Sequence, residues 1–150
     1  MTAIQFPPSA NAFCEQLGIE YPIIGGPMYP CSNPELTAAV SKAGGIGIMQ
    51  PISLTYVHGH EFRQGIRLMR DITDKPIGMN ALIEKSSTKY QQRMSEWIDI
   101  ALEEGIRFFV TSLGKPDWVC RRRSGLPRCH RIEMGQNRPR QRRRWIDMRE

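Results

Sequence analysis

The segment PIIGGPMY, residues 22–29, decides the fold of this chain. A proline opens it, and two β-branched isoleucines form the interior of a short buried strand. Two glycines then remove the side chains at the C-terminal end, and Pro27, which cannot donate to a sheet ladder, ends the strand. Ligands of parallel α/β sheets bind at the C-terminal ends of strands. The segment therefore predicts either one wall of a site for a flat cofactor or, more simply, a strand-to-loop turn.

After this first strand at 22–26, three more short apolar segments follow at residues 45–49, 76–80 and 107–111. Their starts are 23, 31 and 31 residues apart, and helical apolar spacing lies between them. This period predicts parallel strands joined by right-handed helical crossovers. Four such units make half of a (β/α)8 barrel, so we expect an α/β fold, a partial TIM barrel of about four βα units. The alternative is a complete open sheet of four strands.

The apolar spacing also predicts which helix faces are buried. Helices are expected at residues 12–17, 33–43, 54–73 and 86–104, with a further one beginning at 116. Asn33 can cap the second of these, and Ser86, Ser87 or Thr88 can cap the fourth. The side chains expected to face the sheet are Leu36, Ala39, Val40 and Ala43, then Phe62, Ile66, Met69 and Ile72 or Thr73, then Tyr90, Met94, Trp97, Ile98, Ala101 and Leu102.

A half barrel would leave its first and last strands as open edges. We expect inner-face side chains, including Ile23, Ile46, Ile77 and Phe109 or their neighbours, to lose the opposite half of their core and to be exposed. At about 25 cal/mol per Å2 of apolar surface, several exposed side chains would forfeit several kcal/mol. That loss is comparable with the whole stability of a domain, about 5–15 kcal/mol.

The composition indicates a single globular part and a different C-terminal part. Residues 1–120 hold 10 Lys/Arg and 12 Asp/Glu, a formal net charge of −2, whereas residues 121–150 hold 11 Arg, no Lys and 3 Asp/Glu, a net charge of +8. No apolar run approaches the ~20 residues of a membrane span, and the N-terminus lacks the features of a signal peptide. The four cysteines form no CxxC pair, so we expect free thiols in the cytoplasm.

Three interpretations of the Arg-rich segment 121–150 stay open. It can be a nucleic-acid-binding arm, in which the run RRRW at 142–145 supplies phosphate contacts and a stacking ring. It can be a disordered extension. It can also be an out-of-frame translation, because permitted codons for 124–150, read one nucleotide later, can encode a further strand, helix and strand. The last hypothesis best explains Arg without Lys.

Small and polar residues follow every expected strand, and they form the candidate site. They are Gly26, Pro27 and Met28 after the first strand, Gln50 after the second, Asn80 after the third, and Thr111 and Ser112 after the fourth. None is an acid or a base, which suits a cofactor that carries its own chemistry, such as a flavin. The Asn80 carboxamide can bind the edge of a flavin ring or its phosphate tail, or it can simply cap its own loop.

Other motifs indicate structure rather than chemistry. GGIG at 44–47 follows a helix and opens a strand, which is the reverse of a dinucleotide-binding fingerprint. His58 and His60 lie two residues apart and would not share a helix face, so we interpret them as a solvated helix entrance and expect no metal. Cys31 is interpreted as a structural thiol, because no charged residue adjoins it.

Four segments resemble, in order and spacing, the N-terminal half of the nitronate monooxygenases, formerly 2-nitropropane dioxygenases. They are LGIEYPIIGGPM, SNPELTAAVSKAGGIGIM, ITDKPIGMN and EEGIRFFVTSLGKP, and they cover about residues 14–120. The resemblance implies a TIM barrel that uses FMN and molecular oxygen to oxidise alkyl nitronates, with Gly26, Pro27, Met28 and Asn80 in contact with FMN. The FMN-dependent enoyl-acyl-carrier reductases share much of this half, so that activity is an alternative.

The chain also departs from that family. The family's catalytic histidine, in a Gly-Gly-His type segment beyond the fourth strand, and its main phosphate-binding region have no counterpart here. None of His58, His60 and His130 matches that segment. We therefore assign no catalytic residue and expect a truncated, inactive chain that binds FMN weakly or not at all.

Overall fold

The computed structural model describes residues 7–83, 87–114 and 119. In chain order the elements are α1 (Pro8–Leu17), β1 (Ile24–Gly25), α2 (Pro34–Lys42), β2 (Ile46–Met49), the π-helical turn η1 (Ser53–Val57), α3 (Phe62–Ile72), β3 (Ile77–Leu82), α4 (Thr88–Glu103) and β4 (Phe108–Ser112). Helices follow strands in the predicted alternation.

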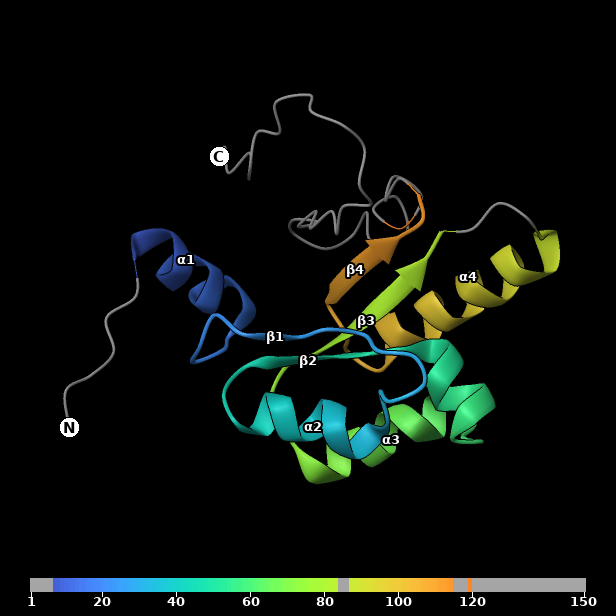
Figure 1. Ribbon diagram of the computed structural model, residues 1–150, viewed down its shortest axis with the longest axis horizontal. Coiled ribbons are helices and arrows are strands. Elements are labelled where there is room, and N and C mark those ends of the chain that lie inside the picture. The colour runs from blue at the N-terminus through green and yellow to red at the C-terminus, as the bar shows by residue number, and fades with distance from the viewer. Residues whose placement is uncertain (1–6, 84–86, 115–118, 120–150) are drawn as a thin grey trace.

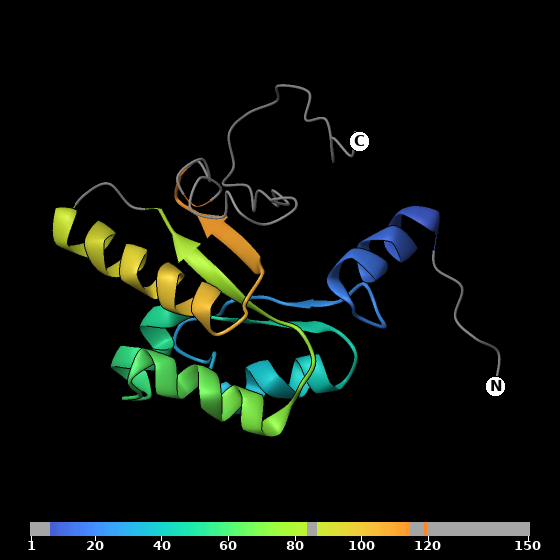
Figure 2. The same ribbon diagram turned by 180° about the vertical axis from the view of Figure 1, so that it is seen from behind.

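The four strands form one parallel sheet in the order β1-β2-β3-β4, as the sequence predicts. Ile24 lies opposite Ile46, and Gly78 lies between Ile48 on β2 and Phe108 on β4. The sheet curls into half of a barrel, with α2, α3 and α4 on its outer side and α1 on its inner side (Figures 1 and 2). The predicted partial TIM barrel is therefore confirmed.

The buried face of α2 differs from the prediction. Asn33 does cap this helix, since its Oδ1 accepts from the Leu36 amide at 2.7 Å. The helix buries Pro34, Thr37, Ala38 and Ser41, while Leu36, Ala39 and Ala43 are exposed and Val40 is half-buried. The physical reason is a close approach: a Cβ on Gly47 would lie 2.0 Å from the Thr37 carbonyl oxygen. At that distance only small side chains fit between helix and strand, so the apolar stripe lies elsewhere on the helix.

The predicted helix 54–73 is divided in two. The turn η1 ends before Gly59, whose φ of +70° belongs to the left-handed region. A new helix, α3, then begins behind Glu61, whose carboxylate accepts from the amides of Arg63 and Gln64 at 3.0 and 2.9 Å. These two hydrogen bonds lower the pKa of Glu61. Within α3, Phe62, Ile66 and Met69 are buried as predicted.

The last helix, α4, agrees best with its apolar spacing. Met94, Trp97, Ile98 and Ala101 are buried, and Tyr90 and Leu102 are half-buried against the same core. Of the three possible caps it uses Ser87, whose Oγ accepts from the Tyr90 amide at 3.4 Å. The short helix α1 begins at Pro8, earlier than predicted, and ends at Gly18 with a φ of +67°.

Two hydrophobic layers cover the two faces of the sheet. The outer layer joins α2, α3 and α4 to side chains such as Met49, Ile77 and Phe109. The inner layer joins Ile46, Ile48, Phe108 and Val110 to α1, and the Phe13 ring meets the Phe108 ring edge to face with centroids 6.5 Å apart. The curled sheet therefore has an apolar core on both sides.

This division corrects the expected inner face. Ile77 and Phe109 belong to the outer layer, because the register pairs Ile77 with Gly47, which packs against α2, and Phe109 with Met79 of the outer core. Ile46 does face inward, yet it is fully buried. Of the four residues named, Ile23 alone is exposed, at 59%, beside the edge strand β1. The expected loss of inner core is therefore confined to the β1 edge.

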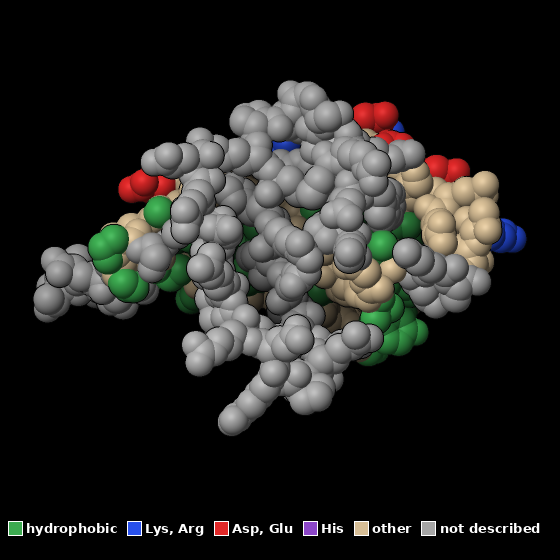
Figure 3. All heavy atoms as spheres, turned by 90° about the horizontal axis from the view of Figure 1, so that it is seen from above, with side chains coloured by type: hydrophobic (Ala, Val, Ile, Leu, Met, Phe, Trp, Pro, Cys, Tyr) green, Lys and Arg blue, Asp and Glu red, His purple; other side chains and the backbone are tan. Residues whose placement is uncertain are grey.

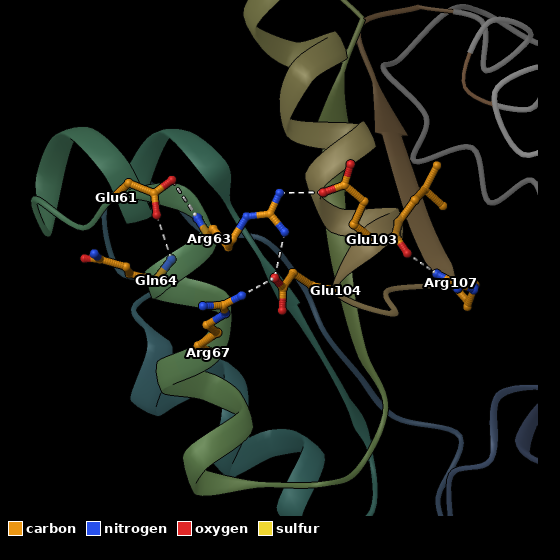
Figure 4. A network of polar contacts seen from close by, with 8 residues as sticks. Glu61, Arg63, Gln64, Arg67, Glu103, Glu104 and Arg107 are labelled. Carbon is orange, nitrogen blue, oxygen red and sulfur yellow. Dashed lines mark hydrogen bonds and ion pairs between the residues drawn. The ribbon is translucent and has the colours of Figure 1, made fainter.

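An ion-pair network joins α3 to the end of α4 (Figure 4). Arg63 bridges Glu103 and Glu104, and Arg67 reaches Glu104 from the next turn at 3.2 Å. The hydrogen bond from Arg63, at 2.8 Å, is the largest of the interactions that lower the pKa of Glu104. The network links two neighbouring helices on the outer side of the sheet.

We predict that Gly47→Ala destabilises the fold by about 1–3 kcal/mol, the range for overpacking a tight contact. The added methyl group would meet the backbone of α2, which cannot move aside as a side chain can. Urea denaturation followed by circular dichroism measures the change. Gly26→Ala is the matched control, because a Cβ there meets nothing within 4 Å. Equal midpoints for the two variants would contradict the close approach.

A second prediction concerns pH. Because the pKa of Glu104 is lowered in the fold, its contribution to stability is present above the unfolded value of 4.5 and disappears as pH falls through the folded value. We expect Glu104→Gln to lower the urea midpoint near neutral pH, and we expect the difference from the parent chain to shrink as the pH falls below 4.5. Glu103→Gln, at a side chain that is 61% exposed, should have the smaller effect. A pH-independent difference for Glu104→Gln would rule out the ion-pair explanation.

Candidate functional site

The candidate site lies along the C-terminal ends of the four strands. Because the strands are parallel, residues 26–28, 50, 80 and 111–112 meet at the same edge of the sheet. The segments 26–32, 50–57, 80–83 and 111–114 contain no Asp, Glu, Lys or Arg. The site is therefore built from backbone, carboxamide and hydroxyl groups, as the sequence indicates. Figure 3 shows the molecule from above, where hydrophobic side chains reach the surface on both flanks.

Asn80 occupies the centre of this edge. It lies inside β3, which continues to Leu82, and it faces the inner side because its neighbours Met79 and Ala81 belong to the outer core. Its side chain is 2% exposed, and its Oδ1 accepts from the Ser112 hydroxyl at 2.8 Å. This bond crosses to the next strand, so the interpretation of Asn80 as a cap of its own loop is wrong. Ser112 orients the carboxamide.

Gly26, Pro27 and Met28 form the rim next to β1. Gly26 follows the strand, and the space where a Cβ would stand is open to 4 Å. The Met28 side chain is 48% exposed, and its backbone is fixed by Ser32, whose Oγ accepts from the Met28 amide at 2.7 Å. A fixed backbone beside open space is a suitable surface for a flat ring. Contact of these three residues with a cofactor stays a prediction.

Gln50 is the second carboxamide of the edge. Its side chain is 7% exposed, and its Oε1 has no hydrogen-bond partner. The Oγ of Ser53, three residues further and fully buried, has none either. Buried polar atoms are normally paired, so two orphaned oxygens in one turn are unusual. The sequence places Gln50 at a strand end, but burial without a partner has no sequence signal, and Ser53 was not anticipated.

Of the described histidines and cysteines, His58 and Cys31 lie near the strand ends, whereas Cys14 lies on α1. The Nε2 of His58 is 3.0 Å from the Pro30 carbonyl oxygen, so this ring joins the loop after β1 to the turn after β2. Cys31 is exposed and Cys14 is buried, and both are free thiols. In the part of the chain that the structure describes, no three His, Cys, Asp or Glu side chains are placed to hold a metal ion.

Two further points concern the chain outside the candidate site. Across residues 7–83 and 87–114, no helix has both the length and the apolar composition needed to cross a membrane. The Arg-rich segment 121–150 and the helix expected from residue 116 lie outside the described residues, apart from Val119, which is buried. The three hypotheses about that segment therefore stay predictions.

We predict that Ser112→Ala lowers stability by about 1 kcal/mol, because it leaves the buried Asn80 Oδ1 without its donor. Ser112→Thr keeps the hydroxyl and is the matched control. Urea midpoints of the two variants measure the difference. Identical midpoints would show that the Asn80–Ser112 bond contributes nothing.

Comparison with known proteins gives consistent matches. A family model described as nitronate monooxygenase matches residues 11–127. A nitronate monooxygenase of Pseudomonas aeruginosa is 39% identical over 89 residues, which are 59% of this chain and 24% of that protein. The chain thus spans about a quarter of the length of this relative.

Solved structures agree with the fold. FabK from Thermotoga maritima superposes with a TM-score of 0.61 and 28% identity, over 76% of this chain and 34% of FabK. A nitroalkane oxidase from Streptomyces ansochromogenes superposes with a TM-score of 0.55 and 21% identity, over 76% of this chain and 40% of that one. The second likeness concerns the fold alone.

Proposed function

The chain belongs to the nitronate monooxygenase family. On that premise we propose that it is the part of an FMN-dependent oxidoreductase that binds the flavin ring. In the complete enzyme the substrates would be an alkyl nitronate and molecular oxygen. We assign residues 1–120 to the N-terminal half of an FMN-binding barrel and residues 121–150 to a separate Arg-rich tail. The free thiols of Cys14 and Cys31 suit a reducing compartment such as the cytoplasm.

The observation that carries this proposal is the uncharged polar edge at the strand ends. It combines open space at Gly26, the oriented carboxamide of Asn80 and the unpaired Oε1 of Gln50. These groups fit the ring of a flavin, whose polar edge alternates hydrogen-bond donors and acceptors. A bound FMN would supply the redox chemistry, since none of these side chains can. Asn80, Gly26, Pro27 and Met28 would bind and orient the ring.

The same edge offers little to the phosphate of FMN. The described segments at the strand ends hold no Lys or Arg that could pair with it. They also hold no carboxylate that could take a proton from a nitroalkane, and the His58 ring is engaged with the Pro30 carbonyl oxygen. We therefore propose that this chain binds flavins weakly, through the ring, and does not turn over nitronates.

We predict that the purified chain binds FMN and riboflavin equally within about threefold, with Kd of about 0.1 mM or weaker, or about −5.5 kcal/mol. Equal affinity is expected because the site recognises the ring and not the phosphate. Quenching of flavin fluorescence during titration with protein measures both constants. FMN binding more than tenfold tighter than riboflavin would reveal a phosphate site and refute this assignment.

Oxygen uptake tests the activity. With FMN and an alkyl nitronate, we expect consumption no faster than with free FMN alone. Reduction of an enoyl thioester by a reduced nicotinamide, the alternative activity, is assayed in parallel and is likewise expected to be absent. Turnover in either assay would overturn the proposal of an inactive half, and the reaction observed would decide between the two activities.

A further inference from the structure

The turn after β2 holds a pair of buried oxygens that the fold itself does not use. Gln50 Oε1 and Ser53 Oγ are both without a partner, although the backbone carbonyl oxygens of the same two residues are hydrogen-bonded. The Gln50 carbonyl oxygen accepts from the Leu54 amide at 3.0 Å, and the Ser53 carbonyl oxygen accepts from the His58 amide at 2.9 Å. An unsatisfied buried acceptor costs about 1–3 kcal/mol, so a retained one needs an explanation.

The position of Gln50 supplies that explanation. Met49 lies opposite Met79 in the parallel register, and both belong to the outer core. Asn80, the next residue of β3, faces the inner side, and from the alternation of side chains we infer that Gln50, directly after β2, faces the same side. One carboxamide thus lies on β3 and the other directly after the neighbouring β2, and only the first has a hydrogen bond to its oxygen, from Ser112.

The chemistry of the free atom limits its partner. A carboxamide oxygen accepts hydrogen bonds and cannot donate them. The ring system of an oxidised flavin carries one N–H group, at N3, flanked by two carbonyl groups. A ring that lies across the strand ends can satisfy Oε1 with that single donor.

We propose that Gln50 is a flavin-binding residue whose Oε1 accepts a hydrogen bond from the ring N3–H. This inference rests on the proposed function, since it assigns one contact within the same site. On this proposal Gln50 contributes to ligand binding and lowers the stability of the ligand-free chain, because its Oε1 is unpaired there. Such residues commonly lower stability in the absence of the ligand they serve.

Gln50→Met tests this role in the full chain, because methionine has a similar length and lacks the polar atoms. We expect the flavin Kd to rise about five- to tenfold, the loss of one hydrogen bond, while the urea midpoint of the ligand-free chain stays equal or rises. Gln92→Met makes the same change on the exposed side of α4 and is the matched control. A lower midpoint for Gln50→Met than for Gln92→Met would show a structural role and overturn the proposal.

N3-methylriboflavin tests the atom. Methylation removes the ring donor, so the parent chain should bind it about five- to tenfold more weakly than riboflavin, and Gln50→Met should bind the two alike. Titrations extend to about 1 mM flavin to include weak binding. An equal effect of methylation on both chains overturns the N3 contact.

The outcomes also separate the inference from its premise. A parent chain that binds no flavin up to this concentration overturns the proposed function and the Gln50 assignment with it. A parent chain that binds riboflavin while Gln50→Met binds it equally well overturns the Gln50 assignment alone.

Discussion

The contact between α2 and β2 at Gly47 is the constraint on which the rest of the structure depends. The Thr37 carbonyl oxygen occupies the place of a side chain at Gly47, and the Gly47 amide donates to Ser41 Oγ at 3.0 Å. This close approach sets how near the first crossover helix lies to the sheet. Gly47 also pairs with Ile77 in the register of β2 with β3, which brings Met49, the residue before Gln50, opposite Met79, the residue before Asn80. The polar edge thus depends on packing at Gly47, which precedes Gln50 by three residues on the same stretch of chain.

Much of this fold follows from the sequence, for reasons that are local. The strands are short apolar runs bounded by Gly and Pro, and α4 carries enough large apolar residues for its spacing to identify the buried face. The face of α2 could not be predicted in this way, because a rule based on hydrophobicity selects Leu36 and Val40. The helix is instead held by the small residues Thr37, Ala38 and Ser41. Close approach depends on the partner strand, which a helix's own spacing does not encode.

The site shows the same division between local and long-range information. The strand-end residues are identifiable from chain order, because parallel strands bring their C-terminal ends together. The bond between Asn80 and Ser112 depends on the register of β3 and β4, over a separation of 32 residues. The Gln50 Oε1 is unpaired because no donor among the described residues lies within hydrogen-bonding distance of it, and a sequence does not show such an absence. Family membership implies a flavin, and the contacts that we propose for it rest on register and burial.

The brevity of β1 affects how the chain behaves among other copies of itself. An edge strand with free backbone groups can recruit further strands and start aggregation. Here the strand Ile24–Gly25 is only two residues long, and Pro22 and Pro27 flank it without an N–H to offer. The exposed side chains of Ile23 and Ile24 give this edge an apolar surface that another copy can contact. A strand of that copy could form only a few backbone hydrogen bonds with β1. At this edge of the sheet the short strand therefore favours small, reversible associations over an extended ladder of added strands.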